Sequence, residues 1–106
     1  MKLGIILNTS EPEAAWNAFR LGMAALREGN GASVFLLGKG VECEASKDWN
    51  FNVQAELTSF KENGGRLLAC GTCLHLRKQK TRVCAVSSMD ELLALVSESD
   101  KVVSFG

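Results

Sequence analysis

The hydrophobic positions along the chain form five short apolar runs, separated by longer segments that mix apolar and polar residues. Each run is continuous rather than alternating, which is typical of strands covered on both faces in a parallel sheet. The pattern therefore predicts five buried strands, at Leu3–Leu7, Ala32–Leu37, Leu67–Cys70, Val83–Val86 and Val102–Phe105.

The longer segments carry start and stop signals of helices. Ser10 and Glu13 have the spacing of a capping box, and Pro12 fits the first helical turn, where its missing N–H costs nothing. This helix is predicted from about Glu13 to Glu28, before a Gly-Asn-Gly stop.

Three further helices are predicted between the remaining runs. One precedes Gly64-Gly65, a short one covers about Thr72 to Lys80, and the last begins with a capping box of Ser88 and Glu91. The helix before Gly64-Gly65 has an apolar face of Val53, Leu57 and Phe60. The last helix has an apolar face of Leu92, Leu95 and Val96.

The alternation of strands and helices predicts an α/β fold, a parallel sheet with helices on both faces. Ligands and chemistry in such sheets lie beyond the carboxyl ends of the strands. The candidate site positions are therefore Asn8 and Thr9, Gly38 to Cys43, Cys70 to Cys73, and Ser87.

The predicted first helix is apolar almost all round, more than one sheet face can cover. We expect part of it, around Trp16 or Met23, to contact another subunit. The alternative is that neighbouring loops cover the surplus.

Composition restricts the class of protein. The 106 residues fit a single domain, 1–106, and 46% of them are apolar, which excludes a disordered chain. The 12 basic and 12 acidic side chains balance, which argues against nucleic acid or a membrane as partner. The opening segment, Lys2 with Leu3–Leu7, is too short for a signal peptide and has no small-residue cleavage site, so we expect a cytoplasmic protein.

Four cysteines without an export signal are more typical of reactive, metal-binding or buried thiols than of a disulfide framework. Cys70 and Cys73 form a Cys-Gly-Thr-Cys motif where a strand passes into a helix. Free N–H groups at a helix start stabilise a thiolate, and the nearby basic residues Arg77 to Arg82 add positive potential. We therefore expect a reactive pair, against the alternative of two buried, inert cysteines.

Other uses of this motif are poorly supported. A thioredoxin places a cis-proline against its cysteines, but Pro12 is the sole proline and belongs to the first helix. Zinc needs four ligands, and Cys70, Cys73 and His75 supply three at most, with His75 badly phased. No glycine-rich phosphate-binding motif is present. A metal is possible only if Cys43 or a second subunit supplies a further ligand, so we expect no metal and no cofactor, and an exposed His75.

The remaining thiols are interpreted separately. Cys43 lies in the longest predicted loop, Gly38 to Asn50, where it is either a relay or resolving thiol or a solvent-exposed bystander. Glu42 and Glu44 beside it should raise its pKa. Cys84 is expected in the core, in the middle of a strand. Trp49 and Phe51, at the junction between this loop and the next helix, are expected to pack.

Segments in the order LGIIL, AWNAFRLGMAALREG, VFLLGKGVE, LLACGTCLHLRK and SDKVVSFG cover nearly the whole chain. In this order and spacing the sequence resembles the DsrE/DsrF-like (TusD- and YchN-like) sulfur-relay family. The resemblance implies a three-layer α/β/α fold with a five-stranded parallel sheet, and a homotrimer or hexamer. It further implies that Cys70 accepts sulfur as a persulfide from a donor protein and passes it to an acceptor protein.

Cys73 has no counterpart in the single-cysteine carriers of that family. A second thiol here would resolve the persulfide into a disulfide and release sulfide. Three functional hypotheses follow. They are sulfur transfer on Cys70, dithiol–disulfide redox exchange between Cys70 and Cys73, and a non-enzymatic oligomeric binding module. A carrier and an enzyme with turnover need the same reactive thiol, so the sequence leaves enzymatic activity open.

Overall fold

The computed structural model describes all residues from 1 to 106, and they form a five-stranded sheet in the order β4-β3-β2-β1-β5. All four pairs of neighbouring strands are parallel, as the continuous apolar runs predict. Four strands match their predicted ranges closely, whereas β4 begins two residues later, at Ala85. The strands are β1 (Lys2–Leu7), β2 (Gly31–Leu36), β3 (Arg66–Cys70), β4 (Ala85–Ser87) and β5 (Lys101–Phe105).

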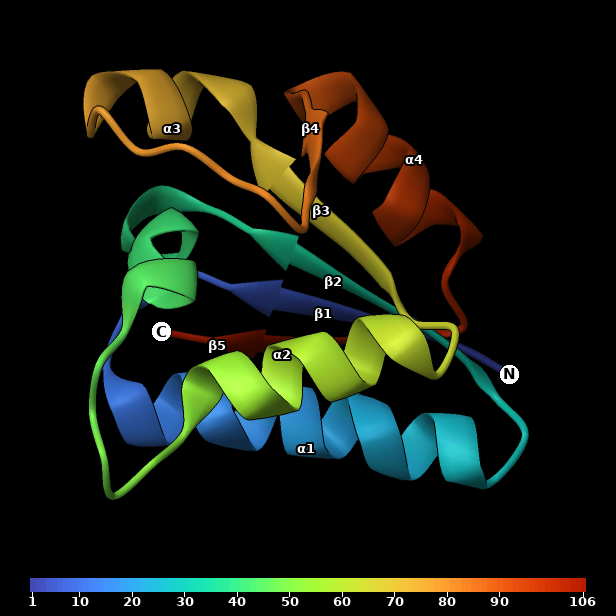
Figure 1. Cartoon of the computed structure of the whole chain (residues 1–106). Helices are drawn as coiled ribbons and strands as arrows, with labels where there is room; N and C mark the ends of the chain where they lie inside the picture. Colours follow the sequence, from blue (N-terminus) through green and yellow to red (C-terminus); the bar gives the residue numbers. More distant parts are fainter.

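Helices cover both faces of the sheet, which gives the predicted three-layer α/β/α arrangement (Figure 1). Helices α1 and α2 lie on one face, and α4 lies on the other, with α3 beyond the end of β3. Right-handed connections explain why α4 lies opposite α1 and α2. The chain steps across the sheet one way from β1 to β4, and then returns past β1 to add β5 at the other edge. The helices are α1 (Pro12–Arg27), the 3₁₀ helix η1 (Gly38–Ala45), α2 (Val53–Glu62), α3 (Gly71–Leu76) and α4 (Met89–Glu98). None of them is long and apolar enough to cross a membrane.

The helix starts show one correct and one wrong sequence prediction. At α4, the Ser88 hydroxyl accepts the N–H of Glu91 at 3.3 Å, as the capping box predicts. At α1 the predicted Ser10 cap is wrong, because the Glu11 carboxylate takes that place and accepts the N–H groups of Glu13 and Ala14. A carboxylate at this position also suits the positive end of the helix dipole.

The main core lies between the sheet and the α1–α2 layer. Phe19 of α1 and Phe60 of α2 are fully buried and their rings meet at 6.0 Å between centroids. The surplus apolar surface of α1 is covered in part within the chain, because the Phe51 ring lies tilted against Trp16 at 5.2 Å between centroids and Ser59 of α2 contacts Met23. Both side chains remain half-buried, so the predicted subunit contact around Trp16 or Met23 stays a prediction.

Apolar surface is instead exposed on the opposite layer. Helix α4 has one buried residue, Leu95, while Met89, Leu93 and Val96 face solvent at helical spacing. We call these three residues the α4 stripe. The expectation that Trp49 packs is wrong, since its side chain is 92% exposed beyond the end of η1.

Candidate functional site

Cys70 and Cys73 meet at the carboxyl end of β3, where the strand passes directly into α3. Cys70 is the residue that caps α3, and its Sγ accepts the backbone N–H of Cys73 at 3.4 Å. The Sγ of Cys73 in turn accepts the backbone N–H of Gly38, at the start of η1, at 3.3 Å. The structure thus brings the motif together with the segment that follows β2, as expected from the topology.

The two thiols differ in accessibility. Cys70 is 3% exposed, whereas Cys73 is half-buried and lies nearer to solvent. Burial raises the pKa of the Cys73 thiol, and its hydrogen bond with Cys70 acts in the same direction. The Gly38 N–H and the Arg77 charge lower that pKa but do not outweigh burial. The sequence expectation of a stabilised thiolate is therefore wrong for Cys73, because desolvation disfavours its charged form.

Gly38 reaches the thiol through a backbone conformation that suits glycine. Its φ is +55°, in the left-handed region, and a Cβ at this position would collide with the Asn8 side chain. The chain therefore turns at Gly38 and aims its N–H at Cys73 rather than continuing as strand.

Ser87 ends β4 beside the cysteines. It is the register partner of Cys70 on the neighbouring strand, so both side chains project from the same face of the sheet. Ser87 is 8% exposed, and its hydroxyl has no hydrogen-bond partner. The carboxyl-edge rule placed Ser87 among the candidate positions, but the missing partner is visible only in the structure.

Cys43 does not lie on an open loop. Its predicted loop contains η1, and the thiol is 0% exposed, so the solvent-exposed alternative is wrong. Burial is the largest cause that raises the pKa of Cys43, followed by the charges of Cys84 and Glu44. A buried, protonated thiol is a poor nucleophile, which weighs against a relay role for Cys43.

Cys84 lies just before β4, so the prediction of a position in the middle of a strand is wrong. Its half-buried side chain packs against the core, as expected in part. Burial raises the pKa of Cys84 from 9.0 to about 11, and the charge of Glu44 adds to the effect. Its thiol donates to the Glu44 carboxylate at 3.8 Å.

Glu44 joins two segments that are distant in the sequence, and sequence reasoning missed this role. Its Oε1 accepts the Thr81 hydroxyl at 2.6 Å and its Oε2 accepts the Arg82 N–H at 2.9 Å. The Thr81 oxygen in turn accepts the N–H of Cys84 at 2.9 Å. A cavity of about 340 Å³, which Glu44 and Arg82 help to line, opens beside this network. No local motif signals such a network, since its members lie 37 to 38 positions apart.

The basic segment after α3 is exposed. The helix ends at Leu76 rather than near Lys80, because Lys78 adopts a left-handed φ of +51°. The N–H of Gln79 then bonds to the Leu74 carbonyl and that of Lys78 to the His75 carbonyl, which is a Schellman ending. His75 is exposed, as predicted.

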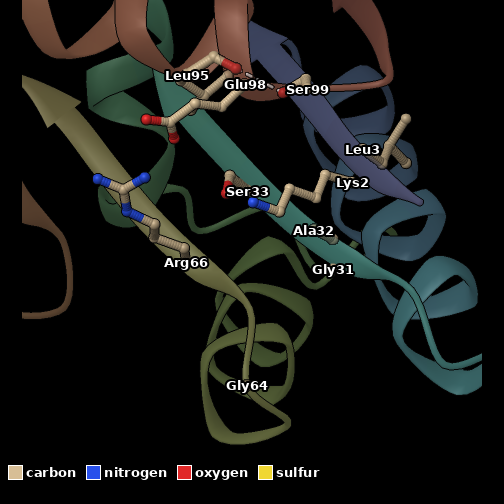
Figure 2. A pocket seen from close by; sticks show the side chains of 10 residues that line it. All are labelled: Lys2, Leu3, Gly31, Ala32, Ser33, Gly64, Arg66, Leu95, Glu98 and Ser99. Atoms are coloured by element: carbon tan, nitrogen blue, oxygen red, sulfur yellow. Dashed lines mark hydrogen bonds between the residues drawn. The ribbon is translucent and has the colours of Figure 1, made fainter.

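A second cavity of about 290 Å³ lies at the opposite edge of the sheet, by the amino ends of β1, β2 and β3. Figure 2 shows Lys2, Ser33 and Arg66 from these strands, with Glu98 from the end of α4. None of the predicted site residues lines it. No group of three or more His, Cys, Asp or Glu side chains comes together in an arrangement that could hold a metal ion.

Comparison with known proteins relates the chain to a family. Residues 1–105 match the DsrE/DsrF-like family. An uncharacterized protein of Methanocaldococcus jannaschii is 33% identical over 115 residues, which cover 99% of this chain and 100% of that protein. The structure of a conserved protein of unknown function from Bacteroides thetaiotaomicron superposes with a TM-score of 0.81, at 20% identity, over 97% of this chain and 93% of that one.

Proposed function

This chain belongs to the DsrE/DsrF-like family, which is associated with sulfur relay, and from that premise we propose that it carries sulfur as a persulfide on Cys70. The observation that supports the proposal is the paired site at the end of β3, where the Cys70 Sγ lies 3.4 Å from the Cys73 nitrogen. Two thiols held at a strand-to-helix junction fit sulfur exchange better than a purely structural role.

The transfer step is a thiol exchange with sulfur as the cargo. The Cys70 thiolate attacks the outer sulfur of a donor persulfide, R–S–SH, so that the new bond forms to that sulfur and the donor's S–S bond breaks. The products are Cys70–S–SH and the donor thiolate, R–S⁻. An acceptor thiolate then takes the same outer sulfur from Cys70 and leaves Cys70 as a thiolate.

Cys73 provides a second route for the loaded sulfur. Its thiolate attacks the Sγ of the Cys70 persulfide, which forms a Cys70–Cys73 disulfide and expels hydrosulfide, HS⁻. The raised pKa of Cys73 keeps its thiolate scarce at neutral pH and so slows this route. This effect favours a carrier over an enzyme that releases sulfide.

Mass spectrometry after incubation with inorganic polysulfide tests the assignment. We expect a gain of whole sulfur atoms on the peptide that contains Cys70, lost in Cys70→Ser and kept in Cys73→Ser. Cys84→Ala serves as the matched control, because its thiol lies outside the pair. Sulfur loading that persists in Cys70→Ser would exclude Cys70 as the carrier.

The second candidate is redox exchange between Cys70 and Cys73, favoured by the contact between the two residues. It requires a reversible disulfide whose reduction potential lies within the range of cellular thiol couples. A titration with glutathione buffers, read as the loss of two alkylation sites, measures it. If both thiols remain reduced across that range while sulfur loading proceeds, the redox function is rejected.

Sulfur relay further implies partner proteins, which act here as sulfur donor and acceptor. We also propose a homo-oligomer, a trimer or hexamer, whose contacts include the α4 stripe, because Met89, Leu93 and Val96 leave apolar surface exposed on one face. Leu93→Glu should lower the mass measured by light scattering, whereas Leu21→Glu on α1 should not. An unchanged mass in Leu93→Glu would exclude the stripe from the contact.

A further inference from the structure

We propose that the Ser87 hydroxyl binds the outer sulfur of the Cys70 persulfide and holds it as the anion, an inference that rests on the proposed function. Ser87 is then a positioning residue for the carried sulfur. The site that it completes is specific for one extra sulfur atom on Cys70.

The unpartnered hydroxyl is the first observation. Burial of a hydroxyl without a hydrogen-bond partner is destabilising, and native structures rarely leave one. Ser87 is 8% exposed and is the sole buried side chain of the structure with an orphaned nitrogen or oxygen. Such a hydroxyl is available to donate to an acceptor that forms in another state of the protein.

The position of Ser87 is the second, independent observation. Ser87 is paired in register with Cys70 on the adjacent parallel strand, so the two side chains lie side by side at the spacing of neighbouring strands, about 4.8 Å. The Cys70 Sγ itself does not satisfy the hydroxyl. A persulfide extends the side chain by one S–S bond of about 2.05 Å, which adds a new acceptor on the sheet face that Ser87 shares.

Two backbone N–H groups of the site are already engaged. The Cys73 N–H already bonds to the Cys70 Sγ, and the Gly38 N–H bonds to Cys73. A donor aimed at the outer sulfur favours its anionic form, because a hydrogen bond to the charged state stabilises that state. An anionic outer sulfur also disfavours attack by the Cys73 thiolate, since the reaction would then expel a doubly charged sulfide.

The experiment compares Ser87→Ala with the wild-type protein after loading with inorganic polysulfide. In a Cys73→Ser background, the rate at which iodoacetamide alkylates the persulfide is followed against pH, because the anion is the reactive form. Loss of the hydroxyl should raise the pH at the midpoint of this rate profile by about one unit. That shift equals a tenfold change, or about 1.4 kcal/mol, near the low end for a hydrogen bond to a charged group. Ser87→Thr, which keeps the hydroxyl, should restore the midpoint.

A second readout follows the persulfide in protein that retains Cys73. Ser87→Ala should release sulfide about tenfold faster and accumulate the Cys70–Cys73 disulfide. Ser33→Ala, which removes a half-buried hydroxyl at the amino end of β2, is the matched control and should leave both readouts unchanged.

The outcomes separate the inference from the proposed function. If wild-type Cys70 takes up no sulfur, the proposed function fails, and the inference fails with it. If loading is normal but the midpoint and the release rate of Ser87→Ala equal those of wild type, only the role of Ser87 is overturned. A lower thermal stability in Ser87→Ala would also contradict an unpartnered hydroxyl, whose removal should not destabilise the fold.

Discussion

Removing the Glu44 carboxylate should destabilise the protein by disconnecting η1 from the segment before β4. In Glu44→Ala the Thr81 hydroxyl and the Arg82 N–H lose acceptors that lie at 2.6 and 2.9 Å. A hydrogen bond to a charged group contributes about 1.5–3 kcal/mol. Because Arg82 is exposed, water replaces part of its bond, and we expect a total loss of about 2–3 kcal/mol.

Urea unfolding measures this loss as a lower midpoint at an unchanged slope. At about 4 °C for each kcal/mol, thermal unfolding should occur about 8–12 °C lower. Hydrogen exchange should quicken at the Arg82 and Cys84 amides first, since the Thr81 oxygen that holds Cys84 is oriented by Glu44. Glu42→Ala, which removes a neighbouring carboxylate on η1, should stay within about 0.5 kcal/mol of wild type.

A double-mutant cycle with Thr81→Val isolates the contact. We expect a coupling energy of at least about 1 kcal/mol between Glu44 and Thr81. If Glu44→Ala is as stable as Glu42→Ala, or if the cycle shows no coupling, the network does not hold the two segments together.

Three further predictions concern stability. Since the pKa of Cys84 is raised from 9.0 to about 11, its protonated thiol stabilises the folded state fully below pH 9, and this contribution is lost as pH rises toward 11. Between pH 9 and 11, the free energy of unfolding should fall by about 2 kcal/mol less in Cys84→Ala than in wild type. An equal fall in both proteins would refute the assignment. Gly22→Ala should cost about 1–3 kcal/mol in urea, because its Cβ would lie 2.6 Å from the fully buried Phe60 ring, whereas Gly31→Ala, with its nearest contact at 3.8 Å, should be neutral. Lys78→Gly should raise the free energy of unfolding by about 0.5–1 kcal/mol, since glycine relieves the left-handed φ of +51°, and a lower thermal midpoint would contradict this.

Local signals in the sequence were enough to predict the fold. Continuous apolar runs identified all five strands, and the Ser88 cap and the spacing of Val53, Leu57 and Phe60 identified α4 and α2. These features depend on side chains within a few positions of one another, which is the range over which caps and helical faces form. The third helix was predicted too long because its end depends on the left-handed conformation of Lys78, a residue that rarely adopts it.

The candidate site was predicted in part. The sequence by itself determined that Cys70 and Cys73 share a strand-to-helix junction, and the carboxyl-edge rule added Gly38 and Ser87 to the same edge. It could not determine which thiols are reactive. Thiol acidity depends on burial and on charges from distant segments. Cys43 is buried, and desolvation raises the pKa of Cys73 against the expected effect of the helix start.

Only the tertiary structure decided how distant segments meet. The register of β3 and β4 places Ser87 beside Cys70, and the packing of η1 brings Glu44 to Thr81. Register and loop packing are set by many contacts summed over the whole core, and no short stretch of sequence encodes them. The sequence thus determined the elements and the chemistry available at the sheet edge, whereas tertiary packing decided which groups share a site and which lack a partner.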